Sequence, residues 1–114
     1  MLNYHGRKFR TIEADPPGPD GGPGGTYQQE GSVVWAELSG GEMVRGSLVG
    51  TCQEDGVLHL TYCGVLTDGR VIAGRLRSVP TVLADGRIRL HEHYERYGAD
   101  AGTGVSVIEE YRDR

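Results

Sequence analysis

Two glutamates in the C-terminal third of the chain, Glu92 and Glu109, are the strongest candidates for chemistry. Each lies in a stretch of β-type alternation, and each is followed two residues later by a tyrosine, Tyr94 or Tyr111. If the two stretches pair as neighbouring strands, the carboxylates share a site and one pKa rises toward neutrality, as a general acid or base requires. The alternative is that arginines or tyrosine hydroxyls at the mouth of the fold satisfy both carboxylates.

Glu92 needs an explanation in any case, because it falls on the apolar face of its strand. In the stretch from Gly86 to Tyr97, that face carries Ile88, Leu90, Glu92 and Tyr94. Burying a carboxylate is costly unless it is paired or hydrogen-bonded. We therefore expect Glu92 either to be neutralised by partners or to face a polar cavity.

The opposite face of the same stretch carries His91 and His93 beside Arg87 and Arg89. Histidines at this spacing are able to chelate a metal with His59 or Glu95. Their arginine neighbours instead predict a solvated outer face or a subunit contact. We expect neither a metal site nor a cofactor, since the chain also lacks a glycine-rich phosphate loop and a nucleophile motif.

The elements that position these residues are short β-type segments separated by glycine-rich turns. Expected strands span residues 6–13, 26–30, 32–39, 42–51, 57–65, 70–79, 86–97 and 104–112. Gly-Gly and Asp-Gly turns predict antiparallel hairpins, and no stretch has helical periodicity. The expected fold is all-β: an up-and-down meander of about eight strands closing into a small lipocalin-like or avidin-like barrel. The alternative is an open or dimerised β-roll.

The more apolar face of each strand is expected to line the barrel, with a polar minority among leucine, isoleucine and valine. That minority comprises Tyr62, Ser78, Glu92, Tyr94, Glu109 and Tyr111. Gly74 also falls on an inward register, where it either permits coiling of the strand or leaves room for a ligand. These residues predict a module that binds a small apolar or amphipathic molecule. The alternative is a cofactor-free isomerase, cyclase or lyase with Glu92 and Glu109 as acid and base.

Length and composition limit the partners. The 114 residues predict one domain, interrupted by a proline- and glycine-rich segment over residues 14–25 that is either a flexible connector or a lid. A net charge of −4 without a basic cluster argues against nucleic acid. No apolar run is long enough for a transmembrane helix and no signal segment is evident, so we expect a cytoplasmic protein without a membrane partner. Cys52 and Cys63 are expected to be reduced thiols.

Trp35 falls on the outward register of its strand. An isolated exposed tryptophan is unusual, so it indicates either a contact between two copies of the chain or a register shift of one residue.

Several segments resemble a family of small bacterial β-barrel proteins that often carry the automatic label "N-acetylglutamate synthase". The matching residues are 3–6 with Phe9, Tyr27 with Gln29 and Gly31, 34–36 with 39–41, 46–50 and 86–92, the last being the most specific. The resemblance implies a barrel of the calycin type without established catalytic residues. The labelled activity requires a helix N-terminus at the pyrophosphate of the acyl donor, and this sequence predicts no helix.

Overall fold

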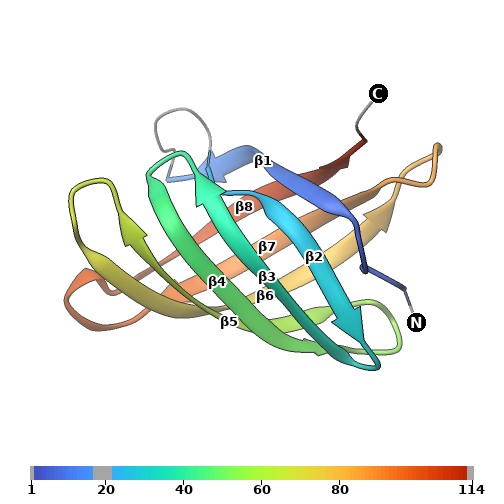
Figure 1. Cartoon of the computed structure of the whole chain (residues 1–114), viewed down its shortest axis with the longest axis horizontal. Helices are drawn as coiled ribbons and strands as arrows, with labels where there is room; N and C mark the ends of the chain where they lie inside the picture. Colours follow the sequence, from blue (N-terminus) through green and yellow to red (C-terminus); the bar gives the residue numbers. More distant parts are fainter. Residues whose placement is uncertain (1, 17–21, 113–114) are drawn as a thin grey trace.

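Eight antiparallel strands follow one another around a closed barrel (Figure 1). They are β1 (Lys8–Asp15), β2 (Gly25–Glu30), β3 (Val33–Gly40), β4 (Met43–Cys52), β5 (Leu58–Leu66), β6 (Val71–Val82), β7 (Ile88–Arg96) and β8 (Gly102–Tyr111). The computed structural model describes residues 2–16 and 22–112. Because β1 pairs with both β2 and β8, the predicted up-and-down barrel is confirmed and the open roll is wrong. Within the described ranges, the helical residues form one 3₁₀ turn, Gly98–Asp100, and no helix is long and apolar enough to cross a membrane.

Three of the hairpin turns repeat one local structure. In each, an aspartate side chain accepts a hydrogen bond of 3.0–3.1 Å from the backbone N–H two residues later. The aspartates are Asp55, Asp68 and Asp85, and the glycines that follow them have φ values of +86° to +88°. Only glycine adopts this backbone region without strain, so the Asp-Gly pairs end one strand and start the next, as expected.

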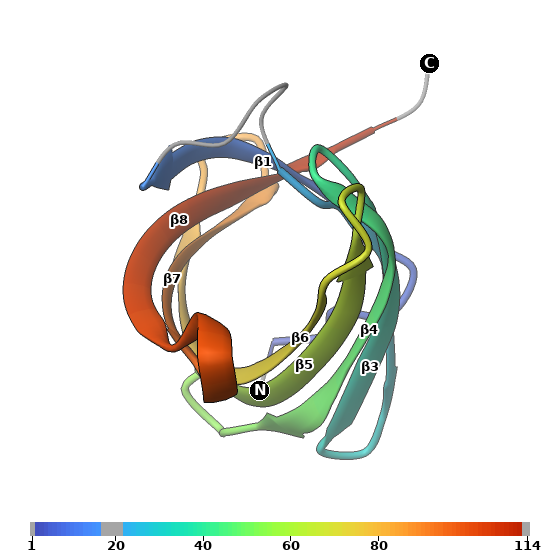
Figure 2. The same cartoon turned by 90° about the vertical axis from the view of Figure 1, so that its left-hand side faces the viewer.

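One end of the barrel is sealed by the N-terminal segment. Tyr4 is fully buried, and its hydroxyl donates a 2.5 Å hydrogen bond to the carbonyl of Gly56 in the β4–β5 turn. The Tyr4 ring lies 6.3 Å from the Phe9 ring and 6.4 Å from the Tyr27 ring, centroid to centroid, and the Phe9 and Tyr27 rings are 4.8 Å apart. Figure 2 looks into the opposite end, which the N-terminal segment does not enter.

The expected inward faces are confirmed for β3, β5, β6 and β7 but wrong for β8. Ile108 and Glu110 are buried, whereas Val105, expected inside, is 44% exposed. Both faces of β8 mix aliphatic residues with a glutamate, so alternation alone does not distinguish them. Pairing with β7 sets the register, because it places Ser106 opposite the inward-facing Glu92.

The segment expected as a loop over residues 14–25 is shorter than predicted at both ends. β1 continues to Asp15 and β2 begins at Gly25, while residues 17–21 of the predicted loop lie outside the described residues. The described residues after the gap are held in place: Thr11 donates a 2.7 Å hydrogen bond to the carbonyl of Pro23, and Gly24 pairs with Ser39.

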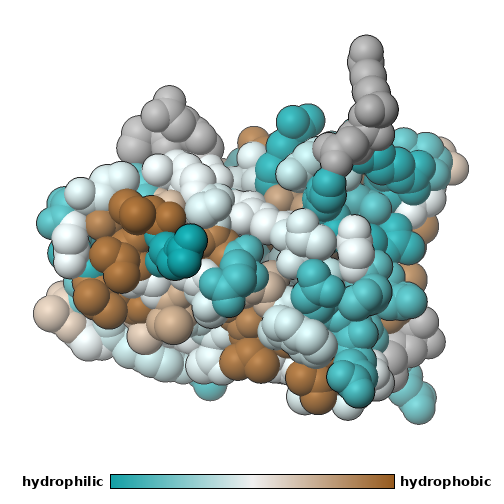
Figure 3. Space-filling view, in the orientation of Figure 1, coloured by the Kyte–Doolittle hydropathy of each residue, from teal (hydrophilic) through white to brown (hydrophobic). Residues whose placement is uncertain are grey.

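The outer wall carries several exposed apolar side chains. Trp35 is 38% exposed and lies opposite Val49, so its outward register is confirmed and the one-residue shift is wrong. Figure 3 shows further apolar surface gathered toward one end of the molecule. At the open end, the strands β4, β5 and β6 contribute the exposed Val44, Val65 and Val71.

Candidate functional site

The site is built on one rung across three strands, with Glu92 of β7 in the middle. Ser78 of β6 and Ser106 of β8 pair with Glu92 on its two sides, so all three side chains point into the barrel. The Ser106 hydroxyl donates to one carboxylate oxygen at 2.9 Å, and the Ser78 hydroxyl donates to the other at 3.2 Å. The neighbouring strands therefore supply Glu92 with neutral partners.

No cation among the described residues pairs with Glu92. Protein surrounds its carboxyl group, and burial raises its pKa from 4.5 to about 7, although the hydrogen bonds from Ser106 and Ser78 partly oppose this rise. The second inward glutamate, Glu110 at the sealed end, is treated differently. Its carboxylate forms an ion pair with Arg7 at 2.8 Å and accepts a 3.0 Å hydrogen bond from the backbone N–H of Ile88. The chain compensates the charge of Glu110 but leaves that of Glu92 uncompensated.

Two tyrosines lie over glycines of the adjacent strands, closer to the open end. Tyr94 pairs with Gly104, and a Cβ on that glycine would clash with the Tyr94 hydroxyl. Tyr62 pairs with Gly74, where a Cβ would lie 2.8 Å from the Tyr62 hydroxyl. Gly74 therefore permits the close approach of the Glu95 backbone carbonyl of β7 and also leaves room for the Tyr62 ring, rather than for a ligand.

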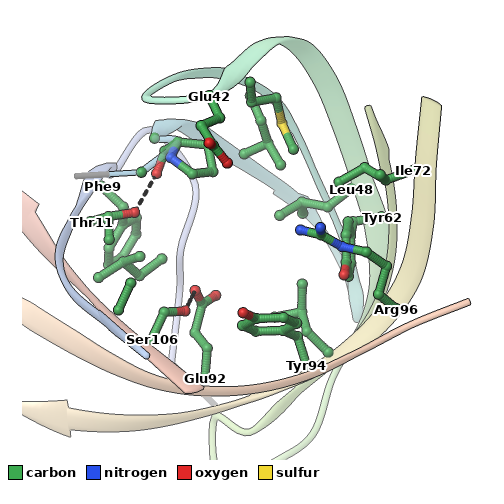
Figure 4. A pocket seen from close by; sticks show the side chains of 18 of the residues that line it. Phe9, Thr11, Glu42, Leu48, Tyr62, Ile72, Glu92, Tyr94, Arg96 and Ser106 are labelled. Atoms are coloured by element: carbon green, nitrogen blue, oxygen red, sulfur yellow. Dashed lines mark hydrogen bonds between the residues drawn. The ribbon is translucent and has the colours of Figure 1, made fainter. Parts of the chain in front are cut away.

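Arg96 occupies the next inward position of β7, after Glu92 and Tyr94. Its neighbours in the sheet are Gly74 and Gly102, which offer no side-chain partner. Figure 4 shows the Arg96 guanidinium group extending over the cavity beside Tyr62, while Tyr94 points toward Glu92.

These residues line a cavity of about 170 Å³ that opens at the end away from Tyr4. The rest of its wall is mostly apolar. Large aliphatic side chains form much of that wall: Leu38, Met43, Leu48, Leu66, Ile72, Leu76 and Ile108. Pro16 and Pro23 lie at its edge, so described residues on both sides of the predicted loop reach the cavity. An apolar cavity of about 150 Å³ is known to hold benzene, so this one suits a molecule of about six to ten heavy atoms.

The structure brings together four of the six residues expected in the site. Tyr62, Glu92 and Tyr94 line the cavity, and Ser78 lies fully buried behind Glu92.

Glu109 and Tyr111 were expected inside, and this placement is wrong. Strands β7 and β8 do pair, but Glu109 lies opposite Arg89 on the outer wall and forms a 2.6 Å ion pair with it. That guanidinium holds the pKa of Glu109 below its usual range. Tyr111 also lies outside, where the Arg10 guanidinium is 5.3 Å from its ring centroid. The two carboxylates therefore share no site, and the acid–base pair of Glu92 and Glu109 is excluded.

Arg96 and Ser106 belong to the site but were not predicted. A signal for Arg96 was present, because it continues the alternation that places Ile88, Leu90, Glu92 and Tyr94 on one face. Ser106 was missed because the faces of β8 were interchanged. Its role depends on the register between two strands, which composition does not encode.

The outer faces hold the remaining candidate residues. His91 and His93 point outward and are exposed, as expected, and His91 lies 3.3 Å from the Thr81 hydroxyl. Within residues 2–16 and 22–112, no three metal-ligating side chains gather in one place. Cys52 is buried, Cys63 is exposed, and both are free thiols.

A family model described as "Avidin-like protein" matches residues 2–111. No curated protein and no solved structure matches the chain.

Proposed function

Because the chain belongs to the avidin-like protein family, we propose that it is a binding protein whose barrel holds one small amphipathic molecule. The observation that carries this proposal is that Glu92 faces a mainly apolar cavity and that no cationic side chain among the described residues pairs with its carboxyl group. A purely structural carboxyl group would be compensated as Glu110 is. In a ligand site, the cost of burying Glu92 is retained because a bound hydroxyl, amide or amine compensates it.

The division of the wall supports the same proposal. Binding pockets for small molecules combine a mainly apolar surface with a few convergent polar groups. Here the aliphatic side chains of β3 to β6 provide the apolar surface, and β7 provides Glu92, Tyr94 and Arg96 along one line. A molecule in this cavity would have its polar groups oriented mainly by β7, with the Tyr62 hydroxyl of β5 beside Arg96.

A thermal-shift screen of alcohols, amides, amines and acids of about six to twelve heavy atoms tests this proposal. A compound at 100 times its Kd stabilises the fold by about 2.7 kcal/mol, which is on the order of 10 °C for a domain of this size. The screen is repeated on Leu76→Trp, which fills the cavity, and on Val82→Trp, which adds the same ring on the outer wall of β6. Hits should stabilise the wild type and Val82→Trp but not folded Leu76→Trp. Equal shifts in all three proteins would contradict binding inside the barrel.

A second candidate function is cofactor-free proton transfer by Glu92, favoured by its pKa of about 7. A general acid or base works best when its pKa lies near the operating pH. The compounds that bind are incubated in deuterated water, and exchange of their acidic C–H protons is followed by NMR. Exchange that disappears in Glu92→Gln supports the enzyme, whereas binding without exchange supports the binding protein.

We also propose that two copies of the chain meet through the outer wall around Trp35. The exposed Trp35 and Val49 lie side by side there, which suits an apolar contact. Light scattering after size exclusion should give the mass of a dimer for the wild type and of a monomer for Trp35→Lys. A monomeric wild type across the micromolar range would contradict the contact.

A further inference from the structure

Two buried side-chain atoms in the described residues lack a hydrogen-bond partner: the hydroxyl oxygen of Tyr62 and Nε of Arg96. Both are able to donate a hydrogen bond, and both belong to residues that line the cavity. Leaving such a donor buried and unpaired costs about 1–3 kcal/mol, and native structures keep few of them. The pair therefore marks the place where the folded protein lacks an acceptor.

The polar group of the protein beside Arg96 is the Tyr62 hydroxyl: burial raises the pKa of Tyr62, and the neighbouring guanidinium partly opposes this rise. The Tyr62 hydroxyl oxygen and Arg96 Nε nevertheless make no hydrogen bond, and the sheet explains why no further acceptor lies next to them. Tyr62, Gly74 and Arg96 occupy one rung of β5, β6 and β7, and the next position along it is Gly102. The two glycines flank Arg96 where two serines flank Glu92. Both glycines leave the guanidinium without a neighbour in the sheet that carries a polar side chain.

Several other arginines of the barrel are paired with acids. Arg7 contacts Glu110 at 2.8 Å, and Arg89 contacts Glu109 at 2.6 Å. Among the described residues, no carboxylate lies within ion-pair distance of Arg96. Arg96 is thus a guanidinium group at the edge of an apolar cavity, without a counterion among the residues that the structure describes.

We propose that the bound molecule carries a carboxylate, which accepts hydrogen bonds from Arg96 and Tyr62 while its apolar body extends past Tyr94 toward Glu92. This inference rests on the proposed binding function and specifies its ligand class. A carboxylate suits the site because its two oxygens match the planar fork of a guanidinium group and still accept from a hydroxyl. An alcohol or amine of the same length has no negative charge and no second oxygen to accept a hydrogen bond from the guanidinium group.

The other charged groups facing the cavity are both acidic. Glu42, at the start of β4, points into the mouth in Figure 4 but is exposed, so water screens its charge. Glu92 lies four residues from Arg96 along β7, which separates their backbones by roughly 13 Å. A carboxylate is repelled from the Glu92 end and attracted to the Arg96 end, which fixes the direction in which the molecule enters.

Three six-carbon probes distinguish the charge of the ligand: hexanoate, 1-hexanol and hexylamine. Each is titrated into the ¹⁵N-labelled full chain at pH 7.5, and binding is followed by backbone amide shifts and by the Nε–H resonance of Arg96. Hexanoate should bind at least about tenfold more tightly than 1-hexanol, and it should move the Arg96 resonance. Hexylamine should bind less tightly than hexanoate, because its ammonium group can pair with Glu92 but leaves Arg96 and Tyr62 without an acceptor.

Three variants distinguish the effect of Arg96 on binding from the effect of the overall charge of the protein. Arg96→Gln and Tyr62→Phe should both reduce the preference for hexanoate over 1-hexanol, Arg96→Gln to within about twofold. Arg77→Gln, which removes an exposed arginine of β6 on the outer wall, should keep the full preference. The dispersion of the amide spectrum verifies that each variant is folded, and Tyr62→Phe stands as the second test if Arg96→Gln fails to fold.

The possible failures are distinct. Equal affinity of hexanoate and 1-hexanol inside the barrel, or tighter binding of hexylamine, overturns the carboxylate while the binding function stands. The carboxylate proposal is also overturned if the preference for hexanoate over 1-hexanol remains in both Arg96→Gln and Tyr62→Phe. If no probe moves any cavity resonance at millimolar concentration, both the carboxylate and the binding function are overturned.

Discussion

Replacing Glu92 with glutamine should stabilise the protein at neutral and alkaline pH. The pKa of Glu92 is raised from 4.5 to about 7, so the folded state favours the neutral carboxyl group. Below pH 4.5 the group is protonated in both the folded and the unfolded chain and costs nothing. Above pH 7 it is ionised in both, and the folded protein bears the full cost. Stability contributed by this group is therefore lost as the pH rises from about 4.5 to 7.

The size of the effect follows from the shift. One pKa unit corresponds to about 1.4 kcal/mol, so the shift corresponds to about 3 kcal/mol at pH 8. Glutamine keeps the shape of the side chain, and its amide can still bond to the hydroxyls of Ser78 and Ser106. At pH 8 we expect Glu92→Gln to be up to about 3 kcal/mol more stable than the wild type, and near pH 4.5 to be equal or slightly less stable.

Urea denaturation of both proteins at half-unit steps from pH 4 to pH 9 measures this difference. Glu109→Gln is the matched control, because Glu109 lies on the outer wall with a lowered pKa and an ion pair to Arg89. Its substitution should lower stability at pH 8 by up to about 1 kcal/mol, the opposite sign. If Glu92→Gln is less stable than the wild type at pH 8, or if their difference is constant across the range, Glu92 is a compensated structural residue and our reasoning is refuted.

Three further predictions concern the rest of the barrel. Gly74→Ala should lower the free energy of unfolding by about 1–3 kcal/mol, because its methyl group collides with the Glu95 backbone carbonyl of β7 and with the Tyr62 hydroxyl; an unchanged urea midpoint would contradict this packing. Tyr4→Phe should cost about 1–3 kcal/mol, since the Gly56 carbonyl loses its partner at the sealed end, and calorimetry measures the loss. A chelator should leave the melting temperature unchanged, whereas a structural metal would lower it on removal.

The fold was predictable because two independent signals agreed. The Asp-Gly and Gly-Gly turns indicated hairpins, and alternation along β5, with Leu58, Leu60 and Tyr62 inside, indicated one buried face. Eight consecutive hairpin-linked strands then favoured closure. Strand ends were less predictable: β1 extends two residues beyond the expected end at Glu13, because pairing with β8 continues through Asp15.

The site was predictable only within a strand. Alternation correctly placed Glu92 and Tyr94 on the inner face, since period-two geometry is local. The partners of Glu92 depend on register between strands, and a shift of one residue reverses every side chain. For this reason Ser106 was placed on the outer face and Glu109 on the inner face, and the structure has the reverse. The absence of a partner for Arg96 depends on two glycines on neighbouring strands, which no single stretch of sequence reveals.

Among the described residues, the segment around Tyr4 seals one end of the barrel and the cavity opens at the other. The proposed ligand would enter and leave at this open end, past Arg96 and the edge formed by Pro16 and Pro23. A change that only narrows or widens this doorway slows or speeds arrival and departure by the same factor, so the affinity stays constant while the residence time changes. A change at the deep end, beside Glu92, acts mainly on departure and so on affinity. Substitutions at the rim, at Pro16 or Pro23, should therefore change the residence time of the proposed ligand without changing its affinity. Substitutions at Arg96 or Glu92, at the two ends of the polar line on β7, should change both.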